Sequence, residues 1–154
     1  MRYEELYRSF RWNPPAYFNF TEDVVGHWAR DRGRLALYWV SESGEERRFT
    51  YWDLYRQSLR FARALIGLGV RSGEPVMVLL GKRPEWFVAM LGALRAGALA
   101  IPCTASLRAK DIRFRAQHSE ARVLVTEPAC VEQVEAVRNE CDALRHCILV
   151  GGSS

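Results

Sequence analysis

A single stretch, residues 75–102, decides the fold, and it reads Pro-Val-Met-Val-Leu-Leu-Gly-Lys-Arg-Pro-Glu-Trp-Phe-Val-Ala-Met-Leu-Gly-Ala-Leu-Arg-Ala-Gly-Ala-Leu-Ala-Ile-Pro. Its first part, Val76 to Leu80, is an unbroken apolar run, which is typical of a strand covered on both faces. Pro84 then suits the first position of a helix, where proline loses no hydrogen bond and already has a helical φ. A second apolar run, Ala98 to Ile101, follows the helix at once. Strand, helix and strand make one βαβ unit of a parallel sheet, with a right-handed crossover.

The helix inside this unit has clear ends. No charge interrupts the segment from Trp86 to Leu94, so we expect this helix to be buried. Glu85 in its first turn and Arg95 in its last turn each match the local end of the helix dipole. Gly97 is placed to end the helix in a left-handed conformation.

The same alternation continues toward the carboxyl end. The pattern predicts a helix over 107–119, a strand over 122–126, a helix over 128–141 and a strand over 147–150. The last four residues, 151–154, are interpreted as a loop tail. Alternating strands and helices from Pro75 onward predict an α/β fold with parallel βαβ units in an open sheet.

The residues before this sheet predict further helices and a β-hairpin. Thr21 is expected to cap a helix that reaches Arg30. Two strand-like segments, 35–40 and 47–50, flank the dipeptide Ser43-Gly44 and predict the hairpin.

An amphipathic helix is predicted over 50–68, started by a capping box of Thr50 and Asp53. The apolar face expected for it consists of Leu54, Tyr55, Ala62, Leu65 and Ile66. The opposite face carries Arg56, Arg60 and Arg63, which we interpret as a solvated surface.

The first twenty residues are expected to form an arm. Residues 2–10 predict a short helix, and residues 11–19 are rich in aromatic side chains and broken by prolines. Rings such as Trp12 and Tyr17 are expected to anchor this segment across the domain surface. The predicted organisation is an N-terminal arm, 1–20, and an incomplete N-terminal α/β subdomain, 21–154.

Composition excludes several classes of protein. The 154 residues suffice for one domain with a sizeable core, and 49% hydrophobic with 26% charged residues is ordinary for a globular protein. Twenty-two basic residues against 18 acidic ones are scattered along the sequence, which argues against a nucleic-acid partner. The longest apolar stretch is too short to span a bilayer. The first ten residues contain Glu4 and Glu5 and no apolar core, so a cytoplasmic location is predicted.

Cysteine and histidine give no metal-binding pattern, so no metal site is predicted. The four cysteines form no C-x-x-C pair and are expected to be free, buried thiols. The three histidines lie far apart with no second ligand at metal-binding spacing.

No motif for catalysis stands out, and no catalytic residue is predicted. The sequence has no P-loop and no nucleophile elbow, and Gly67-Leu68-Gly69 lacks the third glycine of a dinucleotide fingerprint. In open α/β sheets the chemistry lies beyond the carboxyl ends of the strands, here in the loops 81–83, 102–106 and 126–127 and in the tail after the last strand. Lys82-Arg83 in the first of these loops could bind an anion or could be solvated, and the sequence leaves both open.

Three segments resemble the N-terminal region of medium-chain acyl-CoA synthetases, which belong to the AMP-forming (adenylate-forming) ligase superfamily. They are Pro15-Ala16-Tyr17-Phe18-Asn19-Phe20, the turn Arg83-Pro84-Glu85-Trp86, and Arg95-Ala96-Gly97-Ala98 running on to Ile101-Pro102. The resemblance extends from about Trp12 to Val150, in matching order.

The resemblance implies an enzyme that activates a carboxylic acid with ATP and then passes the acyl group to coenzyme A, with magnesium neutralising the phosphates. The family's phosphate loop, its aromatic-Thr-Glu segment, its ribose-binding Asp and its lid Lys have no counterpart in these residues. We therefore expect the chain alone to bind no cofactor and to be inactive. Its partner would be the remainder of the synthetase or another subunit.

The resemblance assigns cofactor binding to the loop after the second strand. In the medium-chain branch this loop usually reads Pro-Gly-Thr-x-Gln and helps to line the coenzyme A channel. Here Thr104 matches, whereas Cys103 replaces the glycine and Ser106 replaces the glutamine. A serine hydroxyl can donate one hydrogen bond but reaches less far than an amide. Ser106 could instead be a plain helix N-cap, and the residues leave both roles open.

Two other classes of function remain open. A non-catalytic interaction module would expose an apolar face and form homo-oligomers. A freestanding nucleotide-binding α/β domain would bind a nucleotide without the downstream motifs.

Overall fold

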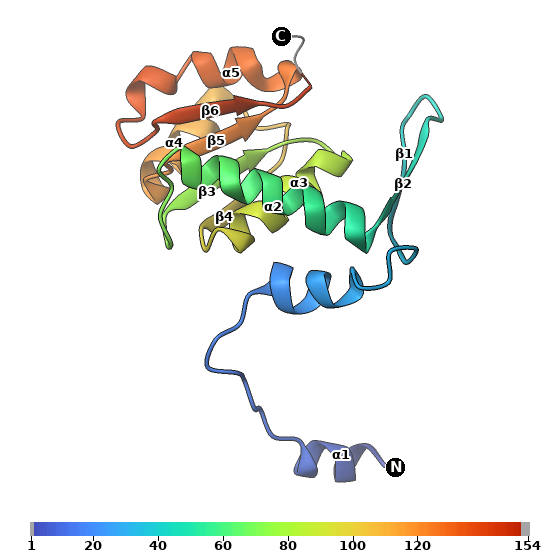
Figure 1. Ribbon diagram of the computed structural model, residues 1–154. Helices are drawn as coiled ribbons and strands as arrows, with labels where there is room; N and C mark the ends of the chain where they lie inside the picture. The colour runs from blue at the N-terminus through green and yellow to red at the C-terminus, as the bar shows by residue number, and fades with distance from the viewer. Residues whose placement is uncertain (1, 152–154) are drawn as a thin grey trace.

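The computed structural model describes residues 2–151, and its centre is a four-stranded parallel sheet. The strands are β3 (Pro75–Leu79), β4 (Leu99–Cys103), β5 (Val123–Thr126) and β6 (His146–Leu149), in the spatial order β4-β3-β5-β6. Met77 pairs with Ile101 on one side and with Leu124 on the other. The parallel βαβ sheet that the sequence predicts is therefore confirmed (Figure 1).

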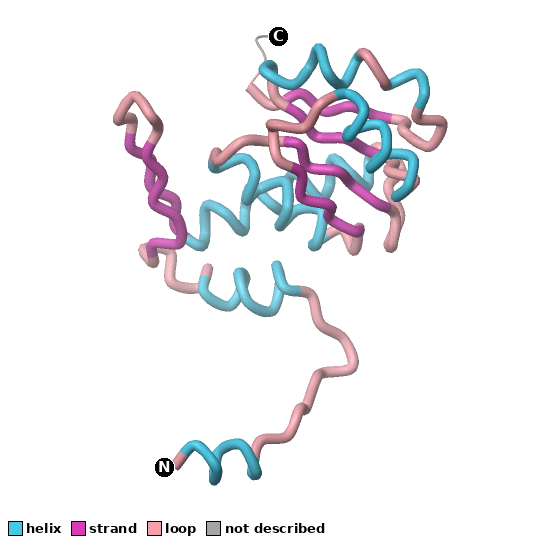
Figure 2. The backbone as a smooth tube through the Cα atoms, turned by 180° about the vertical axis from the view of Figure 1, so that it is seen from behind, coloured by secondary structure: helices cyan, strands magenta, loops and turns pink. Residues whose placement is uncertain are grey.

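Helices cover both faces of this sheet (Figures 1 and 2). On one face Val76, Val78, Val123 and Val125 pack in a core with residues of α2 (Tyr51–Gly67) and α3 (Pro84–Arg95). On the other face Met77, Leu79 and Leu124 pack with α4 (Ala109–Ser119) and α5 (Val131–Glu135). Because both faces are buried, the strands have continuous apolar sequences instead of alternating ones.

Helix α3 has the predicted start and end. Pro84 occupies its first turn, and Gly97 follows it with φ +74°. Gly92 lies where α3 meets α2: a methyl group built on it would come within 2.7 Å of the Phe61 ring. Absence of a side chain at Gly92 lets the two helices approach closely.

Helix α2 has the predicted capping box. The Thr50 hydroxyl accepts a hydrogen bond from the Asp53 N–H at 3.1 Å, and the Asp53 carboxylate accepts one from the Thr50 N–H at 3.0 Å. Leu54, Ala62 and Leu65 are buried, as expected. Ile66 is 58% exposed, so placing it on the apolar face was wrong. It follows the fully buried Leu65 by one residue and therefore points about 100° away from it around the helix axis.

The β-hairpin pairs β1 (Leu35–Val40) antiparallel to β2 (Glu46–Thr50), with Gly44 at φ +84° in the turn. It extends beyond the start of α2 and stands beside the sheet (Figure 1).

The helix before the hairpin includes the π-helical segment η1 (Thr21–Gly26). Thr21 is not its cap: the residue is fully buried, and its hydroxyl donates to the Leu91 carbonyl of α3 at 2.7 Å. Asn19 caps the helix instead, because its side-chain oxygen accepts from the Glu22 N–H at 3.2 Å. The Asn19 side-chain amide also donates to the Leu94 carbonyl at 2.9 Å, which ties the start of this helix to α3.

The N-terminal arm does not lie across the domain, as the sequence led us to expect. Helix α1 (Tyr3–Ser9) has no buried residue, and an extended segment separates it from the rest of the fold (Figures 1 and 2). Trp12 is 87% exposed and Tyr17 94% exposed, so these rings do not anchor the arm.

The prediction of one continuous helix over 128–141 is also wrong. The segment forms three short pieces: η2 (Pro128–Cys130), α5 and η3 (Arg138–Glu140). Val137 breaks the helix with φ −128° and ψ −6°. Val134, Val137 and Cys141 are nevertheless all buried, because successive short turns bring the same apolar residues onto the sheet.

All four cysteines are free, and Cys103, Cys130 and Cys141 are buried, whereas Cys147 is only half-buried. Burial raises the pKa of each thiol. Within residues 2–151, no helix is long and apolar enough to cross a membrane.

Candidate functional site

An apolar cavity of about 600 Å³ lies at the carboxyl ends of β3 and β4, facing the hairpin. Leu37 and Trp39 of β1 form one wall. Trp86 and Phe87 of α3 form another, and the segments 80–83 and 102–104 form the floor. This is the edge where ligands of open α/β sheets bind.

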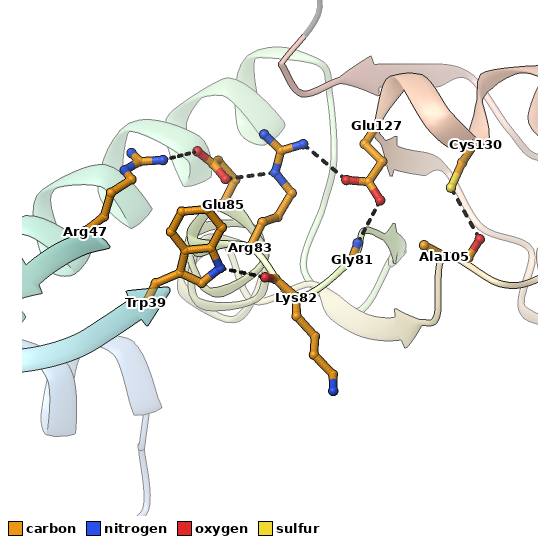
Figure 3. A network of polar contacts seen from close by, with 9 residues as sticks. All are labelled: Trp39, Arg47, Gly81, Lys82, Arg83, Glu85, Ala105, Glu127 and Cys130. Atoms are coloured by element: carbon orange, nitrogen blue, oxygen red, sulfur yellow. Dashed lines mark hydrogen bonds and ion pairs between the residues drawn. The ribbon is translucent and has the colours of Figure 1, made fainter. Parts of the chain in front are cut away.

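Two polar contacts attach the hairpin to this edge. The Trp39 indole N–H donates to the Lys82 carbonyl at 2.7 Å, and the Arg47 guanidinium donates to the Glu85 carboxylate at 3.3 Å (Figure 3). They connect strands β1 and β2 to the loop and helix that follow β3, so the hairpin wall has a defined place relative to the sheet.

A chain of charged side chains continues from Glu85 across the end of the sheet (Figure 3). Arg83 donates to Glu85 at 2.9 Å and to Glu127 at 3.1 Å. Glu127, at the end of β5, also accepts from the backbone N–H of Gly81 at 2.9 Å. The network therefore holds the loops after β3 and β5 together.

The network shifts the pKa values of its members. Burial would raise the pKa of Glu85, but the hydrogen bond from Arg83, the ion pair with it and the bond from Arg47 outweigh burial and lower this pKa. The hydrogen bond to Glu85 is the main reason why the pKa of Arg83 is raised. Both groups are thus held in their charged forms.

The two basic residues of this loop have different roles. Arg83 does meet anions, but they are Glu85 and Glu127 of the same chain. The Lys82 side chain is exposed and points away from the network (Figure 3). Its ammonium makes no hydrogen bond or ion pair within the described residues 2–151, so an anion could reach it from solvent.

Thr104 and Ser106 lie close together at the rim of the cavity. Both residues are exposed, their hydroxyl oxygens are 3.1 Å apart, and Thr104 also lines the cavity whereas Ser106 does not. Ser106 is not the N-cap of α4, because a turn intervenes and the helix begins at Ala109, after Arg108. The Ala109 N–H is bound by the Gln133 side chain at 3.1 Å, so it does not need a serine cap.

Beneath this loop, Cys103 lines the floor of the cavity, and the Cys130 thiol lies 3.5 Å from the Ala105 carbonyl (Figure 3). Thr126, at the end of β5, is 3% exposed, and its hydroxyl is the single buried side-chain oxygen or nitrogen in residues 2–151 that has no hydrogen-bond partner. Across the same residues, no group of three potential metal ligands gathers.

Sequence reasoning missed Trp39 and the role of Glu127. The weak signal for Trp39 was its alternation with Leu37 along β1, which places these two on one face of the strand. Glu127 lay in one of the predicted loops, but nothing local indicates its bonds to Gly81 and Arg83, which are 46 and 44 residues away.

The chain is similar to known proteins of one enzyme family. The family described as AMP-binding enzyme matches residues 25–154. The mitochondrial acyl-coenzyme A synthetase ACSM3 of Mus musculus is 34% identical, covering 99% of this chain and 27% of its own length. The mitochondrial acyl-coenzyme A synthetase ACSM2A of Homo sapiens is 37% identical, covering 91% of this chain and 26% of its own length.

Solved structures of an acyl-CoA synthetase and of a CoA ligase are also similar to this chain. The acyl-CoA synthetase of Brucella canis has a TM-score of 0.85 and 27% identity, covering 99% of this chain and 29% of that structure. The anthranilate CoA ligase AuaEII, solved with anthranoyl-AMP, has a TM-score of 0.80 and 25% identity, covering 90% of this chain and 26% of that structure. The chain thus spans little more than a quarter of the proteins that it matches.

The predicted cytoplasmic location is wrong in the light of this comparison. It rested on the composition of the first ten residues, whereas the curated relatives are mitochondrial synthetases and point to the mitochondrion. Residues 3–9 form an exposed, acid-containing helix, which carries no information on the location of a longer protein.

Three findings agree with one another: the α/β fold, the family match over residues 25–154, and the similarity to acyl-CoA synthetases. The chain therefore belongs to the AMP-binding enzyme family and corresponds to an N-terminal portion of an acyl-CoA synthetase.

Proposed function

We propose that this chain is the part of an AMP-forming acyl-CoA synthetase that builds one wall of the acyl and coenzyme A sites. The whole enzyme would convert a carboxylic acid, ATP and coenzyme A into acyl-CoA, AMP and pyrophosphate, a step of fatty-acid metabolism. The observation that carries this proposal is the apolar cavity at the carboxyl edge of the sheet, with Trp39 on one side and Phe87 on the other. An apolar wall of this kind suits the hydrocarbon part of an acid and offers no group for its chemistry.

Coenzyme A would contact the rim of the cavity through Thr104 and Ser106. Both residues are exposed, and because one hydroxyl donates to the other, the remaining O–H is free to donate a hydrogen bond to an incoming ligand. The loop carries a buried Cys103 where the family has glycine, which leaves the contact to the two hydroxyl groups.

ATP and magnesium would be held elsewhere in the whole enzyme. The residues present do not fit them: the sequence has no phosphate loop, and no cluster of metal-binding side chains gathers within residues 2–151. Preorganised phosphate donors supply most of the stabilisation in such reactions, so a chain without them would be inactive by itself.

The division into an arm, 1–20, and an incomplete α/β subdomain, 21–154, belongs to the same proposal. Both edge strands expose large apolar residues, Leu99 at 58% on β4 and Leu149 at 49% on β6. Such edges are suited to pairing with further strands. The remainder of the synthetase would cover them, and without it the chain would form homo-oligomers.

Pyrophosphate release from ATP by the purified chain, with magnesium and a panel of carboxylic acids, tests the proposal. We expect no acid-dependent release from the chain and release by the full-length synthetase that contains it. In that synthetase, Ser106→Ala should raise the KM for coenzyme A and leave the KM for the acid unchanged, because Ser106 does not line the cavity, with Arg113→Gln on α4 as a surface control. Acid-dependent turnover by the isolated chain would overturn the proposal, since it would require an ATP site within these residues.

A further inference from the structure

Helix α2 carries a row of arginines along the side that faces away from α3. Arg56, Arg60 and Arg63 follow Trp52 at spacings of four, four and three residues, which places all four side chains on one face. The three arginines are exposed. Although basic residues are scattered in the sequence, helical periodicity gathers these into a stripe.

The loop before the hairpin extends this stripe. The guanidinium of Arg32 lies 4.6 Å from the centre of the Trp52 ring, in cation–π contact. Arg32, Trp52, Arg56, Arg60 and Arg63 together are called the arginine stripe below. From Trp52 to Arg63 the stripe is about 17 Å long, at 1.5 Å per residue.

The described residues offset the charge of the stripe only weakly, at Arg56, which attracts the Asp53 carboxylate without forming an ion pair. Within residues 2–151 none of its four arginines forms an ion pair, whereas Arg113 and Arg138 elsewhere on the surface each pair with a glutamate. The nearest acid on the helix, Asp53, has its carboxylate bound to Thr50. Like charges three and four residues apart disfavour a helix, so the stripe weakens α2 slightly. The stripe weakens α2 and has no ion-pair partner within residues 2–151. We therefore expect its binding partner to be an external, anionic molecule.

The stripe ends beside exposed apolar side chains. Ile66, three residues after Arg63, is 58% exposed, and Leu68 is 38% exposed. Guanidinium groups and an indole ring on one face of α2, with exposed aliphatic side chains at the end of the same helix, match the charged headgroups and the apolar boundary of a lipid bilayer. A nucleic acid offers the same charge but no apolar layer for Ile66 and Leu68.

We propose that the arginine stripe, with Ile66 and Leu68 at its end, binds the surface of an anionic phospholipid bilayer. Contact is peripheral: the apolar face of α2 stays packed on the domain, and the outward face supplies the charge. The proposal does not depend on the enzymatic role, because it rests on the outer surface of α2 and not on the cavity.

Vesicle flotation of the full chain tests it. Vesicles of phosphatidylcholine alone are compared with vesicles containing a quarter phosphatidylglycerol, in low and in high salt. We expect binding to the anionic vesicles only, and a loss of at least about tenfold between 0.05 and 0.3 M salt, because surface charges are screened.

Variants locate the surface. The triple variant Arg56→Gln, Arg60→Gln, Arg63→Gln should weaken binding by about a hundredfold, at roughly fivefold per arginine. The matched control, Lys110→Gln, Arg113→Gln, Arg115→Gln, removes three exposed charges from α4 and should change binding by less than about twofold. Ile66→Ser should weaken binding with all charges kept. Circular dichroism checks that each variant is folded.

Three results would overturn the proposal. Equal losses in the two triple variants would mean that net charge alone drives binding. Binding to neutral vesicles would mean that the stripe is not the cause. Unchanged vesicle binding by the stripe variant, together with loss of its binding to a single-stranded RNA, would assign the surface to a nucleic acid.

Discussion

The contact between α2 and α3 at Gly92 allows a sharp test of the packing, because two effects of one substitution oppose each other there. Replacing this glycine by alanine favours the helix by about 1 kcal/mol, since alanine restricts the unfolded chain and forms helix readily. The added methyl group, however, would lie 2.7 Å from the Phe61 ring and 3.0 Å from the Ser58 carbonyl oxygen. Ordinary contacts of such a carbon begin at 3.4 Å.

The magnitude follows from which atom has to move. The Phe61 ring can turn, but the Ser58 carbonyl belongs to the backbone of α2, so the two helices must separate by a few tenths of an ångström. Overpacking of this kind costs about 1–3 kcal/mol. Subtracting the gain in helix propensity, we expect Gly92→Ala to lower the free energy of unfolding by about 1 kcal/mol.

Gly67 is the matched control, because it ends α2 and no atom lies within 4 Å of the methyl group that Gly67→Ala would add. There we expect a gain of about 0.5 kcal/mol. Urea unfolding measures both variants against the parent chain. If Gly92→Ala stabilises the chain as much as Gly67→Ala does, then α2 and α3 do not approach each other as closely at Gly92 as described here. In a Phe61→Leu background, the cost of Gly92→Ala should shrink.

Three further predictions concern the rest of the fold. Thr126→Val removes a buried hydroxyl that has no partner, so urea unfolding should show a gain of about 1 kcal/mol; a loss would mean that the hydroxyl is hydrogen-bonded. The pKa values of Asp53 and Glu85 are lowered in the folded chain, so both stabilise it above about pH 4, and this stability is lost as the pH falls through their lowered values. A urea midpoint that stays constant from pH 6 to pH 2.5 would contradict this, and Glu85→Gln should make the decline shallower. Removing residues 1–18 should leave the melting temperature within about 1 °C, because none of the described residues 2–18 is buried, and a clear fall in calorimetry would show that the arm packs on the domain.

Much of the fold could be predicted because its signals are local. The unit from Pro75 to Cys103 has its apolar runs, helix start and helix end within thirty residues, and the structure reproduces each of them. The break at Val137 could not be predicted from apolar spacing, because one helix and a series of short turns bury the same residues. Exposure of Trp12 could not be predicted either, since a segment without periodicity does not indicate which surface it meets.

The candidate site was predicted only in outline. The carboxyl edge of the sheet follows from topology, and the loops 81–83 and 102–106 were placed there correctly. The contacts that shape the site join residues far apart in sequence: Trp39 reaches the Lys82 carbonyl over 43 residues, and Glu127 reaches Gly81 over 46. No local motif encodes such pairs, because they arise only when the strands are in register.

The attachment of the hairpin has a consequence for how the cavity can vary in size. Strands β1 and β2 project from the start of α2 (Figure 1), and they contact the loop after β3 through Trp39 and helix α3 through Arg47. The wall they form belongs to a separate two-stranded sheet, whereas the opposite wall is a helix packed in the core. Leu37 and Trp39 pair with Phe49 and Arg47 of β2 and with no strand of the four-stranded sheet, so a change in their size alters the width of the cavity without altering the pairing of that sheet. Substitutions in the hairpin can thus resize the cavity while the β-sheet beneath it keeps its register.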